Sequence, residues 1–264
     1  MALVVCATPI GNLEDVTLRV LAELRAADVV LCEDTRHTRG LLERHGIAGV
    51  RLLSYHEHNE AARTEELLPR LVAGERIALV SDAGMPGVSD PGARIVRAAL
   101  DADVLVAVLP GPSAVETALV ASGFAGEAFQ FVGFLPRGAS ALSSLWPTLT
   151  TTTVAFESPQ RLPATLASLA AFDASRPVAV CRELTKKFEE VVRGSATYVA
   201  ARFSAPPKGE ITLVIGAGES EPDEAAALRA VAELVDAGIP RKRAAEIVSS
   251  LTDVPRNALY RGSL

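Results

Sequence analysis

The chain has 264 residues, of which 49% are hydrophobic, and its 26 Lys and Arg against 32 Asp and Glu give a formal net charge of −6. At roughly 150 residues per domain, this length predicts about two domains, and the composition excludes disordered and low-complexity classes of protein. The acidic balance argues against general affinity for nucleic acid, so any RNA partner must be bound by a local basic patch.

The sequence shows no sign of export or of a membrane span. No apolar run approaches the ~18 residues that cross a bilayer, and the N-terminal sequence MALVVCATPIGN lacks the basic segment of a signal peptide. The cysteines Cys6, Cys32 and Cys181 are widely spaced and form neither a disulfide framework nor a zinc motif. We therefore expect a cytoplasmic protein in a reducing compartment.

Residues 1–122 alternate short β-branched runs with longer amphipathic segments, a pattern typical of βα units around a mostly parallel sheet. Ligands of open α/β sheets bind at the carboxyl ends of the strands, so the loops that follow the strands should share one rim. The predicted strands are Leu3–Ala7, Val29–Cys32, Arg51–Ser54, Ile77–Val80 and Val104–Leu109.

Residues 123–218 have longer, more closely spaced strands and few helices, such as Pro159–Ala171, which predicts a second α/β domain with antiparallel pairing. Residues 222–264 carry helical patterns at Ala225–Ala237 and Arg241–Leu251 and a short third one at Val254–Leu264. The predicted fold class is therefore α/β, with two α/β domains followed by a small tail that resembles a helix-turn-helix unit.

The loop SDAGMPGVSDPG (Ser81–Gly92) is the most informative stretch. Its glycines permit close approach of the backbone to a ligand, and Asp82 at the strand end can accept hydrogen bonds from hydroxyls or an amine. Asp90-Pro91 is typical of a helix start. The alternative is a long βα connection without a ligand. Neither the dinucleotide fingerprint nor the P-loop motif occurs, so ordinary dinucleotide and P-loop sites lose their main support.

Two further Gly/Pro turns follow predicted strands, TPIGN (Thr8–Asn12) and LPGPSA (Leu109–Ala114). Each turn suits the approach of a phosphate or adenosyl ligand, and Ser113 suits the N-cap of the next helix. The alternative for both is simply a capped helix start.

The segment CEDTRHTR (Cys32–Arg39) gathers charges at one strand end, either as a solvated helix start or as a surface that faces a polyanionic substrate. His56 and His58 could suggest zinc, but no convincing third ligand is present, so we expect no metal. FESPQRL (Phe156–Leu162) and CRELTKKFEE (Cys181–Glu190) place carboxylates and cations at strand ends, for proton transfer and phosphate contact or as surface ion pairs.

The ordered set of motifs resembles the 16S ribosomal RNA cytidine 2′-O-methyltransferase family, a branch of the tetrapyrrole (corrin/porphyrin) methylases. This resemblance implies S-adenosylmethionine as cofactor, a cleft between two α/β domains, a homodimer, and methylation of one cytidine ribose in the decoding region of 16S rRNA in the small subunit. The motifs are ATPIGNLEDVTLRVL, CEDTRHTR, SYHEHNE, ALVSDAGMPGVSDPG, LPGPSA, VGFLPR, FESPQRL, CRELTKKFEEVVRG and KGEITLVIG.

The resemblance also implies where the cofactor lies, whereas the catalytic candidates follow from the chemistry of methyl transfer and the RNA-binding candidates from clusters of cations. Asp82 is expected near the ribose or amino group of the cofactor, and Lys186 would need a lowered pKa to act as a base. The expected catalytic candidates, in no fixed order, are Glu157, Glu183 and Lys186. The expected cofactor-binding residues are Pro9, Gly11, Ser81, Asp82, Ala83, Gly84, Pro110, Gly111, Ser113 and Ala114. The expected RNA-binding residues are Arg36, Arg39, Arg161, Arg182, Lys187, Arg241, Lys242 and Arg243.

Two positions and one segment depart from the family pattern. Members commonly have Thr at the position of Met85 and His at that of Gln160, and the segment after FLPR is usually basic, whereas here only Arg137 is charged. Two alternatives stay open, a methylase that acts on a tetrapyrrole carbon and a ribosome-associated binding module without chemistry.

Overall fold

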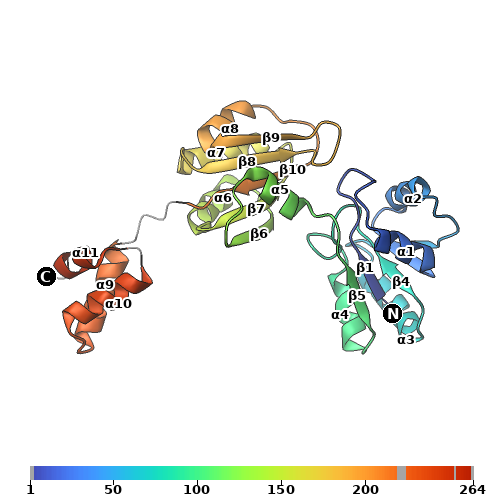
Figure 1. Ribbon diagram of the computed structural model, residues 1–264, viewed down its shortest axis with the longest axis horizontal. Helices are drawn as coiled ribbons and strands as arrows, with labels where there is room; N and C mark the ends of the chain where they lie inside the picture. Colours follow the sequence, from blue (N-terminus) through green and yellow to red (C-terminus); the bar gives the residue numbers. More distant parts are fainter. Residues whose placement is uncertain (1–2, 219–223, 253, 263–264) are drawn as a thin grey trace. The chain divides into compact units, whose positions relative to one another are not determined.

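Two five-stranded sheets organise the first of two units into which the chain divides, Met1–Ala217 and Gly218–Leu264 (Figure 1). The computed structural model describes residues 3–218, 224–252 and 254–262. Within these ranges, no helix is both long enough and apolar enough to cross a membrane.

The first sheet is wholly parallel, as the sequence predicts, with the strand order β3-β2-β4-β1-β5. Alternation along each strand feeds two cores. Val4 and Cys6 pack with helices α1 and α2 on one face, and Leu3 and Val5 pack with α3 and α4 on the other. The elements are β1 Leu3–Cys6, α1 Leu18–Ala26, β2 Val29–Cys32, α2 Thr35–Arg44, β3 Leu52–Ser54, α3 Glu60–Val72, β4 Ile77–Leu79, α4 Ala93–Asp101 and β5 Val106–Leu109.

The second sheet has the order β6-β7-β10-β8-β9 and is antiparallel except for one pair. Strands β6 and β7 are parallel, because the helix α6 carries the chain back between them. The predicted antiparallel pairing is therefore correct for β7–β10, β10–β8 and β8–β9 and wrong for this edge. The elements are β6 Phe129–Phe134, α6 Ala139–Leu145, a 3₁₀ turn at Trp146–Thr148, β7 Thr152–Glu157, α7 Leu162–Phe172, β8 Pro177–Arg182, β9 Glu190–Ser195, α8 Ala196–Arg202 and β10 Ile211–Ile215.

Helix α5 (Ala114–Ser122) comes directly after the last strand of the first sheet but packs on the second sheet. Its apolar residues Val115, Ala118 and Leu119 share a buried core with Val154 and Val214. Helices α6, α7 and α8 belong to the core on the opposite face. The predicted domain boundary between residues 122 and 123 falls at the end of α5 and stays a prediction. The packing of α5 on the second sheet shows that this helix belongs structurally with the residues that follow it.

Over residues 224–252 and 254–262, the second unit forms three helices, α9 (Glu224–Asp236), α10 (Arg241–Leu251) and α11 (Arg256–Gly262), around a small apolar core. Gly238 ends α9 with φ +89°, a conformation that favours glycine, and its N–H donates to the carbonyl of Val235. The first two helices lie close to the predicted positions. Parts of the predicted tail, 222–223, 253 and 263–264, lie outside the described residues.

Candidate functional site

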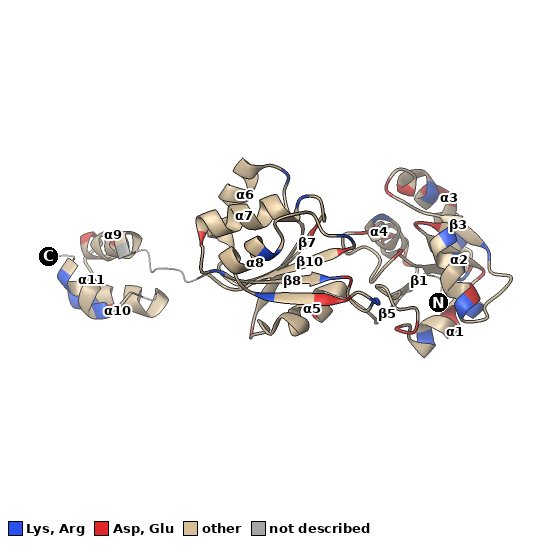
Figure 2. Ribbon diagram, turned by 90° about the horizontal axis from the view of Figure 1, so that it is seen from above, with Lys and Arg blue, Asp and Glu red and all other residues tan. Residues whose placement is uncertain are grey.

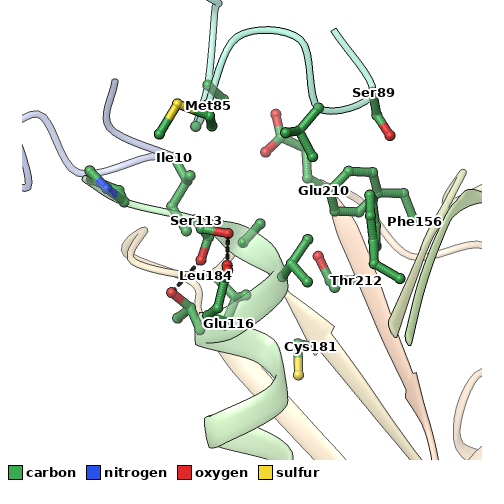
Figure 3. Close-up of a pocket in the computed structure, with 18 of the residues that line it drawn as sticks. Ile10, Met85, Ser89, Ser113, Glu116, Phe156, Cys181, Leu184, Glu210 and Thr212 are labelled. Carbon is green, nitrogen blue, oxygen red and sulfur yellow. Dashed lines mark hydrogen bonds between the residues drawn. The ribbon is translucent and has the colours of Figure 1, made fainter. Parts of the chain in front are cut away.

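A cavity of about 1000 Å³ lies in the first unit, where loops of the first sheet meet strand ends of the second (Figure 3). This volume is at the upper end of the ~300–1000 Å³ found for ligand sites. The walls are mainly apolar, with a few polar side chains. They are formed by Ile10, Ala83–Met85, Val88–Asp90, Pro110–Thr117, Phe129, Phe131, Phe134, Phe156–Pro159, Cys181, Leu184 and Gly209–Thr212.

Six of the ten expected cofactor-binding residues line this cavity: Ala83, Gly84, Pro110, Gly111, Ser113 and Ala114. Gly84 has φ +77°, and its N–H and carbonyl both bond to the backbone of Thr8, at 3.0 and 2.8 Å. A Cβ on Gly111 would lie 2.9 Å from that of Ala7, so only glycine permits this approach. The two glycines therefore hold three loops of the first sheet in one tight wall.

The other four expected residues lie beside the cavity rather than in its wall. Pro9, Ser81 and Asp82 line a small depression next to α2. The Asp82 carboxylate accepts a hydrogen bond from the backbone N–H of Asp34 at 3.0 Å, and the Asp34 side chain in turn caps α2. Asp82 thus joins the loops after β2 and β4 and holds the cavity wall in place.

Gly11 faces the loop between β8 and β9. A Cβ on Gly11 would lie 2.6 Å from Cγ of Lys186, and the N–H of Asn12 donates to Oγ1 of Thr185 at 3.0 Å. This glycine therefore serves the contact between the two halves of the unit.

Glu157 lines the cavity but is fully occupied by hydrogen bonds. Its Oε1 accepts from the N–H of Ser158 at 2.6 Å and from Nε of Arg161 at 2.8 Å. Its Oε2 accepts from Nη2 of Arg161 at 3.0 Å and from the hydroxyl of Thr165 at 2.6 Å. Arg161 also donates to the carbonyl of Leu135 at 2.6 Å. The pair therefore anchors the loop after β6, and the expected roles of Glu157 as a base and of Arg161 in RNA contact stay predictions.

Lys186 lies between two carboxylates, with Nζ 3.0 Å from Oε1 of Glu183 and 3.0 Å from Oε2 of Glu210. Burial acts to lower the pKa of Lys186, but the two ion pairs outweigh it and hold the pKa above its ordinary value. The Glu210 N–H and then Lys186 lower the pKa of Glu183. The lowered pKa that Lys186 would need as a base is therefore absent, and the residue is a fixed cation. Of the three, only Glu210 lines the cavity.

Asp90 is a cavity residue that sequence reasoning treated only as part of a helix start. Burial, followed by the charges of Glu33 and Asp82, raises its pKa to about 6, while a hydrogen bond with Ser81 opposes the shift. Burial and Asp82 likewise raise the pKa of Glu33. A carboxylate perturbed in this way inside a cavity is a candidate for proton transfer. The clue in the sequence is the Asp-Pro-Gly that closes the loop after β4.

The expected RNA-binding residues of the first unit differ in the ion pairs and ring contacts that their side chains make. Arg36 pairs with Asp34 at 2.6 Å on the surface, and Arg182 pairs with Glu190 at 3.0 Å. Lys187 lies over the ring of Phe188, with Nζ 5.6 Å from its centroid. In the part of the chain that the structure describes, Arg39 makes no ion pair and is exposed.

In the second unit, basic residues lie along α10 and α11 (Figure 2). Arg243 and Arg256 both approach Glu246, at 3.4 and 3.5 Å. Neither Arg241 nor Lys242 makes an ion pair with any residue of the described ranges. These two cations at the start of α10 are available for an anionic partner.

The positions that depart from the family pattern lie in different surroundings. Met85 lines the cavity and packs partly against the core of the first sheet, whereas Gln160 is exposed, as is Arg137, the one charged residue of the departing segment. The rings of His56 and His58 are 5.9 Å apart. Within the described residues, no group of three or more His, Cys, Asp or Glu side chains could hold a metal ion.

The chain is similar to known methyltransferases. The family model for Tetrapyrrole (Corrin/Porphyrin) Methylases matches residues 2–200. A Mesorhizobium japonicum protein named ribosomal RNA small subunit methyltransferase I is 43% identical over 98% of this chain and 90% of its own length. A protein of the same name from Micromonospora olivasterospora is 44% identical over 96% of this chain and 83% of its own length.

Solved structures show the same fold at low sequence identity. Uroporphyrin-III C-methyltransferase from Thermus thermophilus, complexed with S-adenosylhomocysteine, has a TM-score of 0.57 at 20% identity, over 81% of this chain and 96% of its own. The methyltransferase CobJ has a TM-score of 0.61 at 18% identity, over 82% of this chain and 94% of its own. At these identities, the likeness concerns the fold alone.

Proposed function

Because the chain belongs to the tetrapyrrole (corrin/porphyrin) methylase family and, within it, to the group named ribosomal RNA small subunit methyltransferase I, we propose that it methylates the 2′-oxygen of a cytidine ribose in the decoding region of 16S rRNA. The cofactor is S-adenosylmethionine, and its demethylated form, S-adenosylhomocysteine, is bound in a solved structure of the same fold. The observation that carries the proposal is the cavity, in which Gly/Pro loops face a perturbed carboxylate.

The residues present fit the cofactor. Gly84 leaves open the space between Ile10 and Pro112, where a Cβ would lie 3.7 Å from Cγ2 of Ile10. Gly84 and the turn Pro110–Ala114 would hold the cofactor, and Asp82 would act by holding the loop that carries Gly84. When bound, S-adenosylmethionine supplies an electrophilic methyl group on a sulfonium. The apolar walls favour this chemistry by excluding water from the reacting groups.

Asp90 is the carboxylate that fits the role of base best. A ribose hydroxyl is a poor nucleophile at neutral pH, and a positioned base contributes about 10²–10⁴-fold to such a reaction. With a pKa of about 6, Asp90 is ionised at neutral pH yet more basic than an ordinary aspartate. Of the original candidates, Glu157 then positions Arg161 and the loop after β6. Glu183 and Lys186 fix the position of Glu210 at the cavity wall.

RNA would be bound by local cations. Leaving out Arg161, which is held by Glu157, the candidates with side chains partly or fully on the surface are Arg36, Arg39, Arg182, Lys187, Arg241, Lys242 and Arg243. The Mesorhizobium japonicum relative aligns over 98% of this chain, so the alignment extends into the second unit. A polar three-helix tail serves a polyanionic partner better than a small porphyrinoid, which supports an RNA substrate. We further propose that the protein is cytoplasmic and acts as a homodimer.

The test is transfer of a tritium-labelled methyl group from S-adenosylmethionine to small ribosomal subunits from a strain that lacks the gene. Free 16S rRNA and a porphyrinoid substrate are assayed in parallel. We expect label in the small subunit, in a dinucleotide that resists alkali, since a 2′-O-methyl group blocks cleavage at that position. Label on a base, or only on the porphyrinoid, would contradict the proposal. Binding to the subunit without transfer would instead support the binding-module alternative.

A further inference from the structure

Four phenylalanine side chains form one wall of the cavity and are called the aromatic wall here: Phe129, Phe131, Phe134 and Phe156. Phe156 is central, with its ring centroid 5.0 Å from that of Phe131 and 5.5 Å from that of Phe134, both in edge-to-face geometry. Phe134 is 62% exposed and Phe129 is 41% exposed. Large aromatic side chains that stay open in a cavity need a partner to cover them.

A β-bulge gives Phe134 its place in the aromatic wall. Strand β6 pairs Phe131 with Val154 but Phe134 with Phe156, so β6 has one residue more than β7 over this stretch. Without the bulge, alternation would place Phe134 on the face of Val132, which packs against the opposite core. The bulge re-aims the ring toward Phe156 and the cavity, as bulges next to functional sites do.

The loop after β4 comes close to the bulge at Gly133. Gly133 has φ +67°, and a Cβ there would lie 3.4 Å from the hydroxyl of Ser89. Ser89 itself has φ +61°, an unfavourable conformation for a residue other than glycine. Ser89 directly precedes Asp90, so the candidate base lies in the same loop that approaches the bulge.

We propose that Phe134, supported by Phe156, is the surface on which the base of the target nucleotide stacks while its ribose is methylated. This inference rests on the proposed function. A 2′-oxygen can enter the cavity only if its nucleotide leaves its neighbours, which costs stacking energy. Stacking on an aromatic side chain restores it, and this is the usual way in which single-stranded RNA is held.

Two observations favour the nucleobase over the adenine of the cofactor. The Gly/Pro loops that would hold the cofactor come from the first sheet and the turn before α5, whereas Phe134 lies at the end of a strand in the second sheet. Arg137 comes three residues later, is exposed, and makes no ion pair with any described residue. An open ring near a free cation is the combination that binds single-stranded RNA.

The experiment compares Phe134→Ala, Phe134→Leu and Phe134→Tyr with the unchanged full-length protein. Phe172→Ala is the matched control, because Phe172 is 48% exposed at the end of α7 and does not line the cavity. Three quantities are measured for each: the concentration of unmethylated small subunits that gives the half-maximal single-turnover rate, the affinity for labelled oligocytidylate, and the calorimetric affinity for S-adenosylhomocysteine.

We expect Phe134→Ala and Phe134→Leu to raise the half-saturating subunit concentration and the dissociation constant for oligocytidylate by about 5- to 150-fold. Phe134→Tyr should stay close to the unchanged protein, since it keeps the ring face, and so should Phe172→Ala. The affinity for S-adenosylhomocysteine should not change in any variant.

Three outcomes would overturn the inference. If Phe134→Leu binds oligocytidylate as well as the unchanged protein, the residue supplies only apolar cover. If S-adenosylhomocysteine affinity falls with RNA affinity, the ring holds the cofactor. If sedimentation shows that Phe134→Ala alters the oligomeric state, a second copy covers the ring. Failure of the proposed function differs from all three, because the unchanged protein would then transfer no methyl group to the small subunit.

Discussion

Asp90 and Glu157 are two carboxylates in the wall of one cavity, and their surroundings are opposite in kind. Glu157, at the end of β7, accepts four hydrogen bonds, two of them from Arg161. Asp90, in the loop after β4, lies near the negative charges of Glu33 and Asp82. Burial with cationic and N–H partners makes a carboxylate structural, whereas burial among like charges leaves it basic and reactive.

The largest expected effect is on the rate of methyl transfer when the basic carboxylate, Asp90, is replaced. Asp90→Asn should lower the single-turnover rate of methyl transfer by about 10²–10⁴-fold, since it removes the base and keeps the shape. In the unchanged protein, the rate should fall as the pH drops through about 6, where Asp90 gains a proton. The variant should lose this dependence. If the single-turnover rate of Asp90→Asn stays within a few-fold of that of the unchanged protein, Asp90 is not the base, and proximity of the reactants accounts for most of the rate enhancement.

The second effect concerns the contribution of the Glu157–Arg161 pair to the free energy of unfolding. Arg161→Ala leaves a buried carboxylate without its cation and should cost about 3–5 kcal/mol of unfolding free energy. The measurement is urea unfolding, with Arg97→Ala as control. Arg97 pairs with Asp101 on the surface, where both side chains are more than half exposed, so this control should lose at most about 1 kcal/mol. Equal losses in the two variants would show that Glu157 is not held by its partners.

Asp82 combines features of both carboxylates. Like Glu157 it accepts a backbone hydrogen bond, and like Asp90 it lies near another negative charge, that of Asp90 itself. Asp82→Ala removes the bond to the N–H of Asp34 and should weaken calorimetric affinity for S-adenosylhomocysteine by about tenfold, the value of one hydrogen bond to a charged group. Asp82→Asn keeps an acceptor oxygen and should retain most of the affinity. If both variants bind equally well, the loop after β4 does not depend on this bond.

Cations of this chain also divide into those held by internal partners and those without an ion pair among the described residues. Arg161 is committed inside the first unit, whereas Arg241 and Lys242 of the second unit are not paired within the described ranges. Replacing Arg241 and Lys242 with Glu should weaken binding to small subunits and reduce the slope of log affinity against log salt by about 1 for each phosphate that the variant no longer neutralises. Arg229→Glu on α9 is the control. An unchanged slope would assign the tail to folding or dimerisation.

The smallest effect is again on Asp90, in stability. Its pKa is raised from 3.8 to about 6 in the folded state, so ionisation opposes folding, and the cost grows as the pH rises from about 4 to about 6. Asp90→Asn removes this cost. Its melting temperature should therefore exceed that of the unchanged protein by a few degrees above pH 6, and the gain should vanish near pH 4. A gain that is the same at every pH would reflect packing rather than charge.

Most of the fold could be predicted from local patterns. The β-branched runs of the first sheet, such as Val29–Cys32, are separated by amphipathic helices, and this spacing leaves parallel pairing as the only simple solution. The parallel pair of β6 and β7 was missed because the crossover ALSSLWPT has no clear helical periodicity. Its helix is stabilised by burying Leu142 and Trp146 in the core of the second sheet.

From the sequence, the site could be predicted only where it depends on backbone conformation, that is, at its glycines and prolines. The glycines and prolines around Gly84 and Gly111 indicate close approach whatever surrounds them. Asp90 was missed because its basicity comes from Glu33 and Asp82, which other strands bring to the same edge. Phe134 was missed because its direction depends on a bulge at Gly133, which alternation along the strand does not reveal.

The path of the chain between the two sheets has a mechanical consequence. The backbone crosses once, from β5 through the turn Pro110–Ser113 into α5, and α5 is packed on the second sheet. That turn is also part of the cavity wall. Any change of angle between the sheets must therefore bend the chain where the cofactor is expected to bind. Within the described residues this turn is the one covalent link between the sheets, so a ligand gripped by it would also restrain their relative orientation.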